Sequence, residues 1–368
     1  MHSFSFNIDI CPFSHLLTQK KKESENMIKK NVLATLVTAL LVLGMLVSEL
    51  YLGMARAQEN QAEKPIIVCT TNVLGSIVKE LVGEEADVIV LVNPGLCPAD
   101  YDMKPSDIYA LSRAKIFFYH GIPGEKPWLQ SLIEAAGNEN LTQVKVSGIY
   151  NTPEGAKNYI RIIGGNLSQA LSIDLSSKIE QMIAEIEEAA NEIANEAQSL
   201  GVSNVNVICM KWQKPFVEWV GFNVIAVYNP PETLSASDIA NLIDTARTNH
   251  AALIIDNLQV SAEFGASVAS EVGAVHVVLT NFPGAIPGTE NLAQMFRYNA
   301  KQLFEGLRRW QTIEGMKALV SENENLKNQL TLYQSLSAVV AVIAVVEFVL
   351  LLVKARKHHE VKLRDFNQ

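Results

Sequence analysis

The stretch Ile66–Leu81, with the sequence IIVCTTNVLGSIVKEL, joins a short apolar run to an amphipathic one. Its first part, Ile66–Cys69, is continuously apolar, as expected for a strand that is buried on both faces of a sheet. The apolar residues that follow recur with helical periodicity and share one face; they are Val73, Leu74, Ile77, Val78 and Leu81. The stretch therefore predicts a buried strand followed by a helix, which is the repeating unit of a parallel sheet.

The same rhythm continues toward the middle of the chain. Val88–Val92 and Ile116–Tyr119 are further β-rich runs. The second run is followed by a turn at Gly121–Gly124 and by a helical pattern around Trp128–Ala136. Strands that alternate with helices at this spacing indicate βα units in a parallel sheet. We expect residues 58–150 to form a first α/β lobe.

Residues 151–200 change character and predict backbone and connecting helices. Gly155–Leu171 is helical in pattern, with Gly164–Gly165 expected to interrupt it. Leu175–Leu200 is a longer helix, and Gly201 is a suitable C-terminal stop. Its apolar stripe consists of Leu175, Ile179, Met182, Ile183, Ile186 and Ile193.

The strand–helix rhythm then restarts and predicts a second lobe over residues 201–312. Its candidate strands are Val205–Met210, Val224–Tyr228, Ala251–Ile255 and Val275–Leu279. Ser235–Asp238 before Ile239 is similar to a capping box, with Asp in place of the usual Glu. The predicted fold class is α/β, with two parallel-sheet βα lobes joined by a long backbone helix. Ligands of such sheets bind beyond the carboxyl ends of the strands, here in the cleft between the lobes.

The N-terminal 57 residues are predicted to be a leader that carries a secretory signal. The uncharged apolar run Val32–Val47 follows Lys29 and Lys30 and precedes small residues at a cleavage site after Ala57. The pattern begins cleanly at Met27, which we expect to be the true start. The alternative is an uncleaved signal anchor, although about 16 apolar residues are short for a membrane span.

The C-terminal part predicts a helical stalk at 313–335, a transmembrane helix at 336–353 and a basic cytoplasmic tail at 354–368. The span is apolar except for Glu347, and the basic residues after it place the tail in the cytoplasm. Glu347 either reaches toward the interface or contacts a partner helix. In the stalk, the side chains at 319, 323, 326, 330 and 333 form a short heptad pattern, typical of a coiled coil or of an amphipathic stalk.

Composition narrows the class of protein. The chain has 368 residues with 19% charged residues, below the roughly 25% of soluble domains, as expected for a chain with membrane segments. A net charge of −9 argues against nucleic acid as a partner. The four cysteines include no C-x-x-C pair, which excludes a zinc ribbon. No G-x-S-x-G, H-E-x-x-H or Walker motif is present, so the protein is not expected to be an enzyme.

The loop Gly95–Asp107, with the sequence GLCPADYDMKPSD, carries a family signature. It resembles, without a gap, the loop G-x-D-P-H-x-Y-E-P-x-P-S-D of the zinc- and manganese-binding receptors of ABC importers, the helical-backbone metal receptors. Cys69–Thr71 is similar to the V-T-T of that family. Phe118–Gly121, with Glu125 and Trp128, looks like its F-Y-N-G…E-x-W-L. The resemblance covers about residues 65–310 and implies a receptor that captures its substrate between two lobes.

The positions that hold the metal in this family are substituted here. The family uses four His or carboxylate ligands drawn from both lobes. The resemblance aligns these four ligands with Ala99, with a position near Thr152, with Met210 and with Thr280. The usual zinc or manganese site is therefore doubtful, because none of these side chains is a His, Asp or Glu.

Other groups in the same segments are candidates for a replacement site. Sulfur ligands select soft transition metals such as Cu(I), and four residues could supply them: Cys97, Met210, Cys69 and Cys209. The alternatives are ordinary core packing, or a disulfide between Cys69 and Cys97. The remaining candidates to line a ligand cleft are Tyr101, His120, Glu125, Trp212 and Thr280.

Two functions remain open from the sequence. The first is a membrane-anchored, extracytoplasmic substrate-binding protein of a metal-type ABC importer. It would bind a metal ion or small metal chelate and work with a permease in the cell membrane. The second is a family member that has lost metal binding and serves as a structural or interaction module on the cell surface. Self-association through the stalk and the transmembrane helix is a further expectation.

Overall fold

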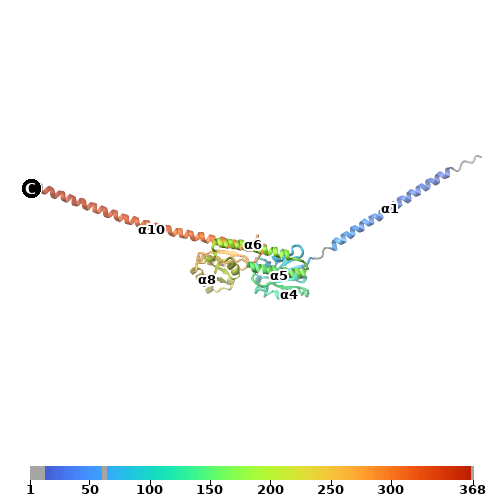
Figure 1. Cartoon of the computed structure of the whole chain (residues 1–368), viewed down its shortest axis with the longest axis horizontal. Helices are drawn as coiled ribbons and strands as arrows, with labels where there is room; N and C mark the ends of the chain where they lie inside the picture. The colour runs from blue at the N-terminus through green and yellow to red at the C-terminus, as the bar shows by residue number, and fades with distance from the viewer. Residues whose placement is uncertain (1–12, 60–63, 366–368) are drawn as a thin grey trace, which may run out of the picture. The chain divides into compact units, whose positions relative to one another are not determined.

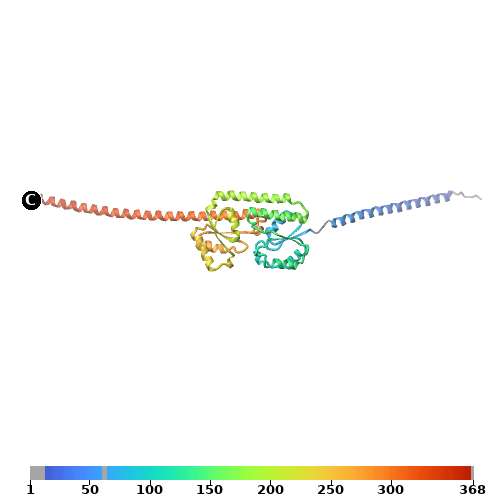
Figure 2. The same cartoon turned by 60° about the horizontal axis from the view of Figure 1, so that its bottom comes forward.

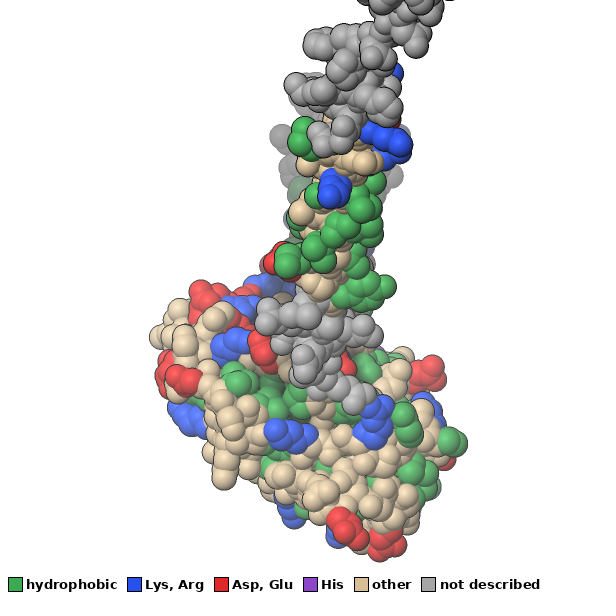
Figure 3. All heavy atoms as spheres, turned by 90° about the vertical axis from the view of Figure 1, so that its right-hand side faces the viewer, with side chains coloured by type: hydrophobic (Ala, Val, Ile, Leu, Met, Phe, Trp, Pro, Cys, Tyr) green, Lys and Arg blue, Asp and Glu red, His purple; other side chains and the backbone are tan. Residues whose placement is uncertain are grey.

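The computed structural model describes residues 13–59 and 64–365, and the chain divides into two compact units after Lys64 (Figure 1). The first unit contains the helix α1 Phe13–Glu59. Within it, Ser24–Tyr51 is long and apolar enough to cross a membrane. Figure 3 shows its hydrophobic side chains as a band with basic side chains at one end. Much of the predicted leader falls on this helix, while residues 1–12 lie outside the described part.

The N-terminal lobe is a parallel sheet of four strands in the order β2-β1-β3-β4. Its strands are β1 Ile66–Cys69, β2 Asp87–Val90, β3 Ala114–Tyr119 and β4 Thr142–Lys145. Its helices are α2 Asn72–Val82, the 3-10 turn η1 Pro98–Asp100, α3 Pro105–Arg113 and α4 Leu129–Ala136. The first three predicted strands are confirmed. The sequence missed β4, because Val144 is its one buried side chain and an edge strand of this kind has no apolar run.

The C-terminal lobe repeats this plan, with parallel strands in the order β6-β5-β7-β8. Its strands are β5 Asn206–Met210, β6 Asn223–Tyr228, β7 Leu253–Asn257 and β8 Val275–Leu279. Its helices and 3-10 turns are η2 Val202–Asn204, η3 Lys211–Gln213, α7 Lys214–Val220, η4 Pro231–Thr233, α8 Ala236–Thr248 and α9 Phe264–Val272. The predicted capping box at the start of α8 is confirmed: Ser235 Oγ accepts from Asp238 N at 3.2 Å, and Asp238 Oδ2 accepts from Ser235 N at 2.9 Å.

Long helices connect the lobes. α5 Pro153–Leu171 packs on α2, and α6 Ser176–Leu200 contacts α5, α7 and α10 Leu292–Asp365. In Figure 2, α6 extends over both lobes. α10 contacts α2 in the first lobe and β7 and β8 in the second. The predicted spanning helix is thus α6, reinforced by the start of α10, and Gly201 ends α6 in the left-handed conformation that the sequence predicts.

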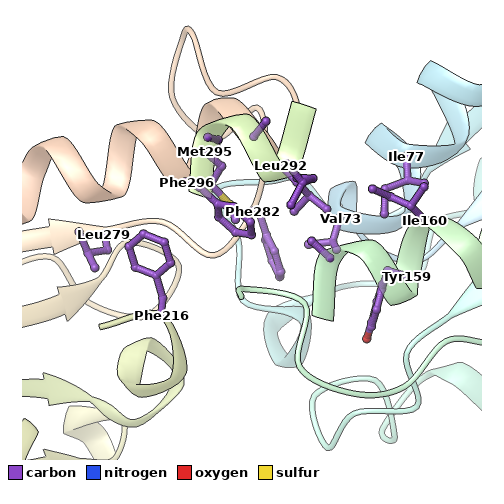
Figure 4. Close-up of a cluster of buried hydrophobic side chains, with 14 of the residues drawn as sticks. Val73, Ile77, Tyr159, Ile160, Phe216, Leu279, Phe282, Leu292, Met295 and Phe296 are labelled. Atoms are coloured by element: carbon purple, nitrogen blue, oxygen red, sulfur yellow. The ribbon is translucent and has the colours of Figure 1, made fainter. Parts of the chain in front are cut away.

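One hydrophobic core is shared by both lobes. It includes Val73 from α2 and Phe216 from α7, with Phe296 of α10 in the same cluster. Figure 4 shows Val73 of α2 and Ile160 of α5 near Phe282, which follows β8, and Leu292, which begins α10. Each lobe also has a smaller core of its own. Because close-packed interiors resist separation, we expect the lobes to move little relative to each other.

The predicted interruption of α5 at Gly164–Gly165 is wrong, because the helix continues through both glycines. A Cβ atom at Gly164 would lie 2.5 Å from Cδ1 of Ile179, whereas one at Gly165 would meet nothing within 4 Å. Gly164 therefore lets α6 approach α5 closely, while Gly165 faces open space.

This pair of neighbours gives a matched test. A Gly164→Ala variant is expected to lose about 1–3 kcal/mol of unfolding free energy, because the added methyl group overpacks the α5–α6 contact. A Gly165→Ala variant is expected to gain about 0.5–1 kcal/mol, because alanine is the better helix former. Urea unfolding of both variants beside the wild type measures the difference. Shifts of the same sign would contradict the packing assigned to Gly164.

The last helix continues well beyond the lobes. α10 runs unbroken from Leu292 to Asp365 and contains the ranges predicted as stalk and membrane span. Its part up to Arg356 includes a stretch long and apolar enough to cross a membrane, with a mean hydropathy of 2.9. Large apolar side chains from Met316 to Val353 are exposed. The boundaries of stalk, span and tail stay predictions.

Candidate functional site

Glu125 is the centre of a buried polar cluster at the carboxyl end of the N-terminal sheet. Its side chain is fully buried. Oε1 accepts hydrogen bonds from Thr70 Oγ1 at 2.5 Å and from His120 N at 3.2 Å. Oε2 accepts from Gly121 N at 2.5 Å and from Ile122 N at 3.3 Å. The carboxylate therefore ties the end of β1 to the turn after β3.

His120 continues this cluster toward α5. Its Nε2 lies 2.7 Å from Thr71 Oγ1, and its Nδ1 lies 3.2 Å from Tyr159 Oη. Tyr159 Oη donates to the carbonyls of Val146 and Gly148, so its oxygen is left to accept from Nδ1–H. Nε2 is then the acceptor for the Thr71 hydroxyl. Burial lowers the pKa of His120 to about 4, which keeps the ring neutral.

The signature loop Gly95–Asp107 is held by aromatic packing. The rings of Tyr101 and Trp128 lie 4.4 Å apart between centroids. Tyr101 Oη donates to Asp107 Oδ2 at 2.6 Å, and Trp128 Nε1 donates to Pro98 O at 2.8 Å. Burial raises the pKa of Tyr101, which keeps its hydroxyl protonated. Tyr101 is thus a structural part of the loop, and Ala99, which the resemblance aligns with the first metal ligand, is exposed at its surface.

In the C-terminal lobe, Thr280 directly follows strand β8 and is fully buried. Its N donates to Asn299 Oδ1 at 3.0 Å, and its carbonyl accepts from Asn299 Nδ2 at 2.8 Å. Its hydroxyl accepts from Gln259 Nε2 at 2.8 Å and donates to Phe282 O at 3.1 Å. Asn281 N donates to Gln259 Oε1 at 3.0 Å. The polar groups of Thr280 are therefore all bonded within the chain.

Side-chain amides also tie the two lobes directly to each other. Each of these amides donates to a backbone carbonyl of the opposite half: Asn72 Nδ2 to Pro283 O (2.5 Å), Gln259 Nε2 to Pro94 O (2.9 Å) and Asn151 Nδ2 to Trp212 O (2.9 Å). Asn151 Nδ2 also lies 3.4 Å from Asn281 Oδ1. The side chains that bridge the two lobes are thus neutral amides, and Trp212 is 44% exposed.

Two buried polar atoms in this region have no partner in the described part of the chain. They are Gln213 Oε1, in the turn after β5, and Asn257 Nδ2, at the end of β7. β5 and β7 are neighbours in the sheet. Since buried polar groups are nearly always hydrogen-bonded, one acceptor and one donor remain here for water or a small polar ligand.

The four candidate sulfurs lie in different surroundings. Cys69 and Cys209 belong to the shared core, Met210 belongs to the core of the C-terminal lobe, and Cys97 is partly exposed in the signature loop. Burial raises the pKa of Cys209 to about 12 and also raises that of Cys69, which disfavours the thiolates that bind metals. All three thiols are free, so Cys69 and Cys97 are not paired here. A soft-metal site at these four residues stays a prediction.

Among the residues that the structure describes, no group of three or more His, Cys, Asp and Glu side chains is placed to hold a metal ion. His120 and Glu125, which the sequence singled out, do lie together, but each is bonded within the chain. The amides of Asn151, Gln213, Asn257 and Gln259 were not identified from the sequence as candidate site groups. One signal could have found Asn257 and Asn281, because each ends or closely follows a predicted strand, where the strand-end rule places ligands.

Two parallel βα lobes bridged by long helices form the architecture that the resemblance to importer receptors predicted. Residues 67–306 match the family described as ZnuA, the periplasmic zinc-uptake complex component A. The chain therefore belongs to this family, as the signature loop predicted. The family is one of transport receptors, which are not enzymes.

Relatives and solved structures agree with this assignment. The manganese-binding lipoprotein MntA of Halalkalibacterium halodurans is 21% identical over 272 residues, covering 66% of this chain and 88% of that protein. The manganese ABC transporter substrate-binding lipoprotein PsaA of Streptococcus anginosus is 32% identical over 89 residues, only 23% of this chain and 29% of its own. A crystal structure of ZnuA superimposes with a TM-score of 0.55 at 19% identity, covering 66% of this chain and 99% of that one. The Mn-bound periplasmic metal-binding protein of Candidatus Liberibacter asiaticus gives 0.56 at 16% identity, covering 66% and 100%.

Proposed function

We propose that the chain is the substrate-binding receptor of a metal-type ABC importer, anchored by its C-terminal helix with the two lobes outside the cell. Membership of the receptor family supports the role. The apolar stretch of α10, followed by Lys354 and Arg356, supports the anchor and its orientation. The partner in the membrane is an ABC permease, which the lobes would load.

The substrate proposed is a metal chelate rather than a bare ion. The observation that carries this choice is the chemistry between the lobes, where neutral amides form the bridges and the described residues include no group of three or more His, Cys, Asp and Glu side chains that could hold a metal ion. A chelator supplies the ligands to the metal itself. The protein then needs hydrogen bonds with the polar groups of the chelator, and the unpaired acceptor Gln213 Oε1 and donor Asn257 Nδ2 support such contacts. The exposed ring of Trp212 offers an apolar face beside them.

Capture would involve only a small opening. The bonds made by Asn72, Asn151 and Gln259 across the cleft must break to admit a ligand, and a net hydrogen bond contributes about 0.5–1.5 kcal/mol. The shared core and the helices that contact both lobes would remain intact. Such a motion resembles a shear of packed elements more than a hinge.

The chelate proposal predicts a difference between free ions and chelates. Full-length protein, purified anaerobically under reducing conditions, is expected to retain no stoichiometric zinc or manganese after gel filtration. Zinc citrate at about 100 times its Kd should raise the unfolding free energy by about 2.7 kcal/mol, because it binds only the folded state. Elemental analysis and thermal melts measure the two effects, with zinc histidine as a second probe.

Two exposed aromatic residues provide a test variant and a matched control for this experiment. Trp212→Ala should reduce the shift caused by the chelate, whereas Tyr109→Ala, on α3 and 63% exposed, should leave it unchanged. Stoichiometric zinc or manganese retained without a chelator would overturn the chelate proposal in favour of a bare-ion receptor.

The direct bonds between the lobes favour one other candidate, a cell-surface structural or interaction module that binds no substrate. In that case the amides across the cleft serve to hold the lobes closed, and no ion or chelate changes the melting temperature. The thermal melts described above distinguish this module from the receptor.

A further inference from the structure

One face of α10 carries an unbroken heptad pattern from the stalk into the predicted membrane span. We call it the heptad seam; its members alternate at spacings of 3 and 4 and are Met316, Leu319, Asn323, Leu326, Leu330, Tyr333, Ser337, Val340, Ala344, Glu347 and Leu351. Every member is exposed in the structure. In the stalk, eight large apolar side chains are exposed, and five of them belong to the seam, the other three being Ile313, Val320 and Leu332. An apolar stripe on a helix that faces water is expected to be covered.

We propose that the heptad seam pairs with the same seam of a second copy of this chain, forming a parallel two-stranded coiled coil that continues into the membrane. A second copy of the chain is the expected partner, because the side chains of a heptad repeat pack between those of the same repeat on a neighbouring helix. The pairing does not depend on what the cleft binds. It rests on the proposed function only through the membrane anchor.

The domain of the same chain leaves the seam free. The early part of α10 packs on the lobes through Phe296, Leu303 and Leu307, which are buried. Counted at about 3.6 residues per turn, these side chains point to the side of the helix roughly opposite Leu319 and Leu326. A second helix can therefore approach the seam from the side that faces away from the lobes.

Polar residues in the stalk fit a parallel, in-register pair. Asn323 occupies an a position, where a single buried Asn selects two strands and fixes their register. Glu322 lies at a g position and Lys327 at the following e position. In a parallel dimer, g and the next e of the partner face each other, so Glu322 of each copy meets Lys327 of the other. The charges are thus complementary to a second copy in this register.

The membrane supplies the rest of the geometry. Two copies anchored in one bilayer have the same orientation and the same height, which makes their stalks parallel and raises their effective concentration. Within the span, Ser337 and Ala344 are small enough to let two helices approach closely. Glu347, the one charged residue of residues 336–353, falls on the same seam and would face its counterpart instead of lipid.

Disulfide cross-linking of the full-length protein in membranes tests the pairing. In a background with Cys11→Ser and Cys97→Ser, single cysteines are introduced on the seam as Leu319→Cys or Leu326→Cys. The matched controls are Ser321→Cys and Asn328→Cys, at f positions on the far side of the helix. Mild oxidation is expected to give a covalent dimer of this chain from the seam variants and to give almost none from the controls.

Charge reversal provides a second readout with an intact apolar seam. Glu322→Lys or Lys327→Glu alone should lower the yield of the Leu326→Cys cross-link several-fold, because like charges then face each other. The double reversal should restore it. Equal cross-linking at seam and control positions, absence of any dimer, or a cross-link to a different protein would each overturn the proposal.

Discussion

A Glu125→Leu variant is expected to lose at least about 3 kcal/mol of unfolding free energy, because it leaves several buried hydrogen-bond donors without an acceptor. The carboxylate of Glu125 accepts bonds from Thr70, His120, Gly121 and Ile122, and its side chain is fully buried. Each unpaired buried donor costs about 1–3 kcal/mol. Leucine fills much of the volume but accepts no hydrogen bond.

The control for this variant is Glu125→Gln, which keeps the shape and one acceptor oxygen. Its loss should be clearly smaller than that of Glu125→Leu, as measured by urea unfolding at neutral pH. If the two variants were equally stable, the hydrogen bonds of Glu125 would not be what holds the turn after β3.

Acidification from pH 6.5 to 4 is expected to destabilise the wild type by up to about 3 kcal/mol through His120 alone. Burial lowers the pKa of this ring from 6.5 to about 4. Below pH 6.5 the unfolded chain takes up a proton on His120, while the folded protein does so only near pH 4. The unfolded state therefore binds more protons in this window, and the stability falls as the pH falls.

The difference between the wild type and His120→Gln isolates this contribution. Glutamine has a donor and an acceptor but does not titrate, so the variant should lack the part of the pH dependence that His120 causes. Other groups titrate in both proteins; burial raises the pKa of Glu80, which acts in the opposite direction. Identical pH profiles for the two proteins would show that His120 is not held neutral by burial.

Much of the fold follows from local sequence pattern. A strand such as Ile66–Cys69 is largely buried on both faces, so its sequence is continuously apolar and easily recognised. The capping box Ser235–Asp238 and the stop at Gly201 depend on neighbouring residues alone. By contrast, β4 and the course of α5 through Gly164 depend on packing partners distant in the sequence, and both were missed.

The candidate site likewise contains some residues that the sequence predicted and others that only the structure revealed. The sequence placed His120 and Glu125 at a strand end, because the strand and turn that carry them are local. Their partners Thr70, Thr71 and Tyr159 come from segments far along the chain. Nothing in the sequence indicates that Thr71 and Tyr159 bond the two nitrogens of one ring, which only the docking of α5 on the sheet brings about.

By itself, the sequence determined that this chain has two βα lobes and, through its resemblance to metal-importer receptors, the family to which it belongs. Periodicity suffices for the lobes, since apolar spacing follows the local geometry of helices and strands. The family follows from the resemblance of the loop Gly95–Asp107. Only the tertiary structure decided that the two lobes are bridged by amides of Asn72, Asn151 and Gln259. Asn and Gln side chains are mostly found on protein surfaces. Whether such a side chain faces water or another lobe depends on contacts between residues up to 211 positions apart in the chain.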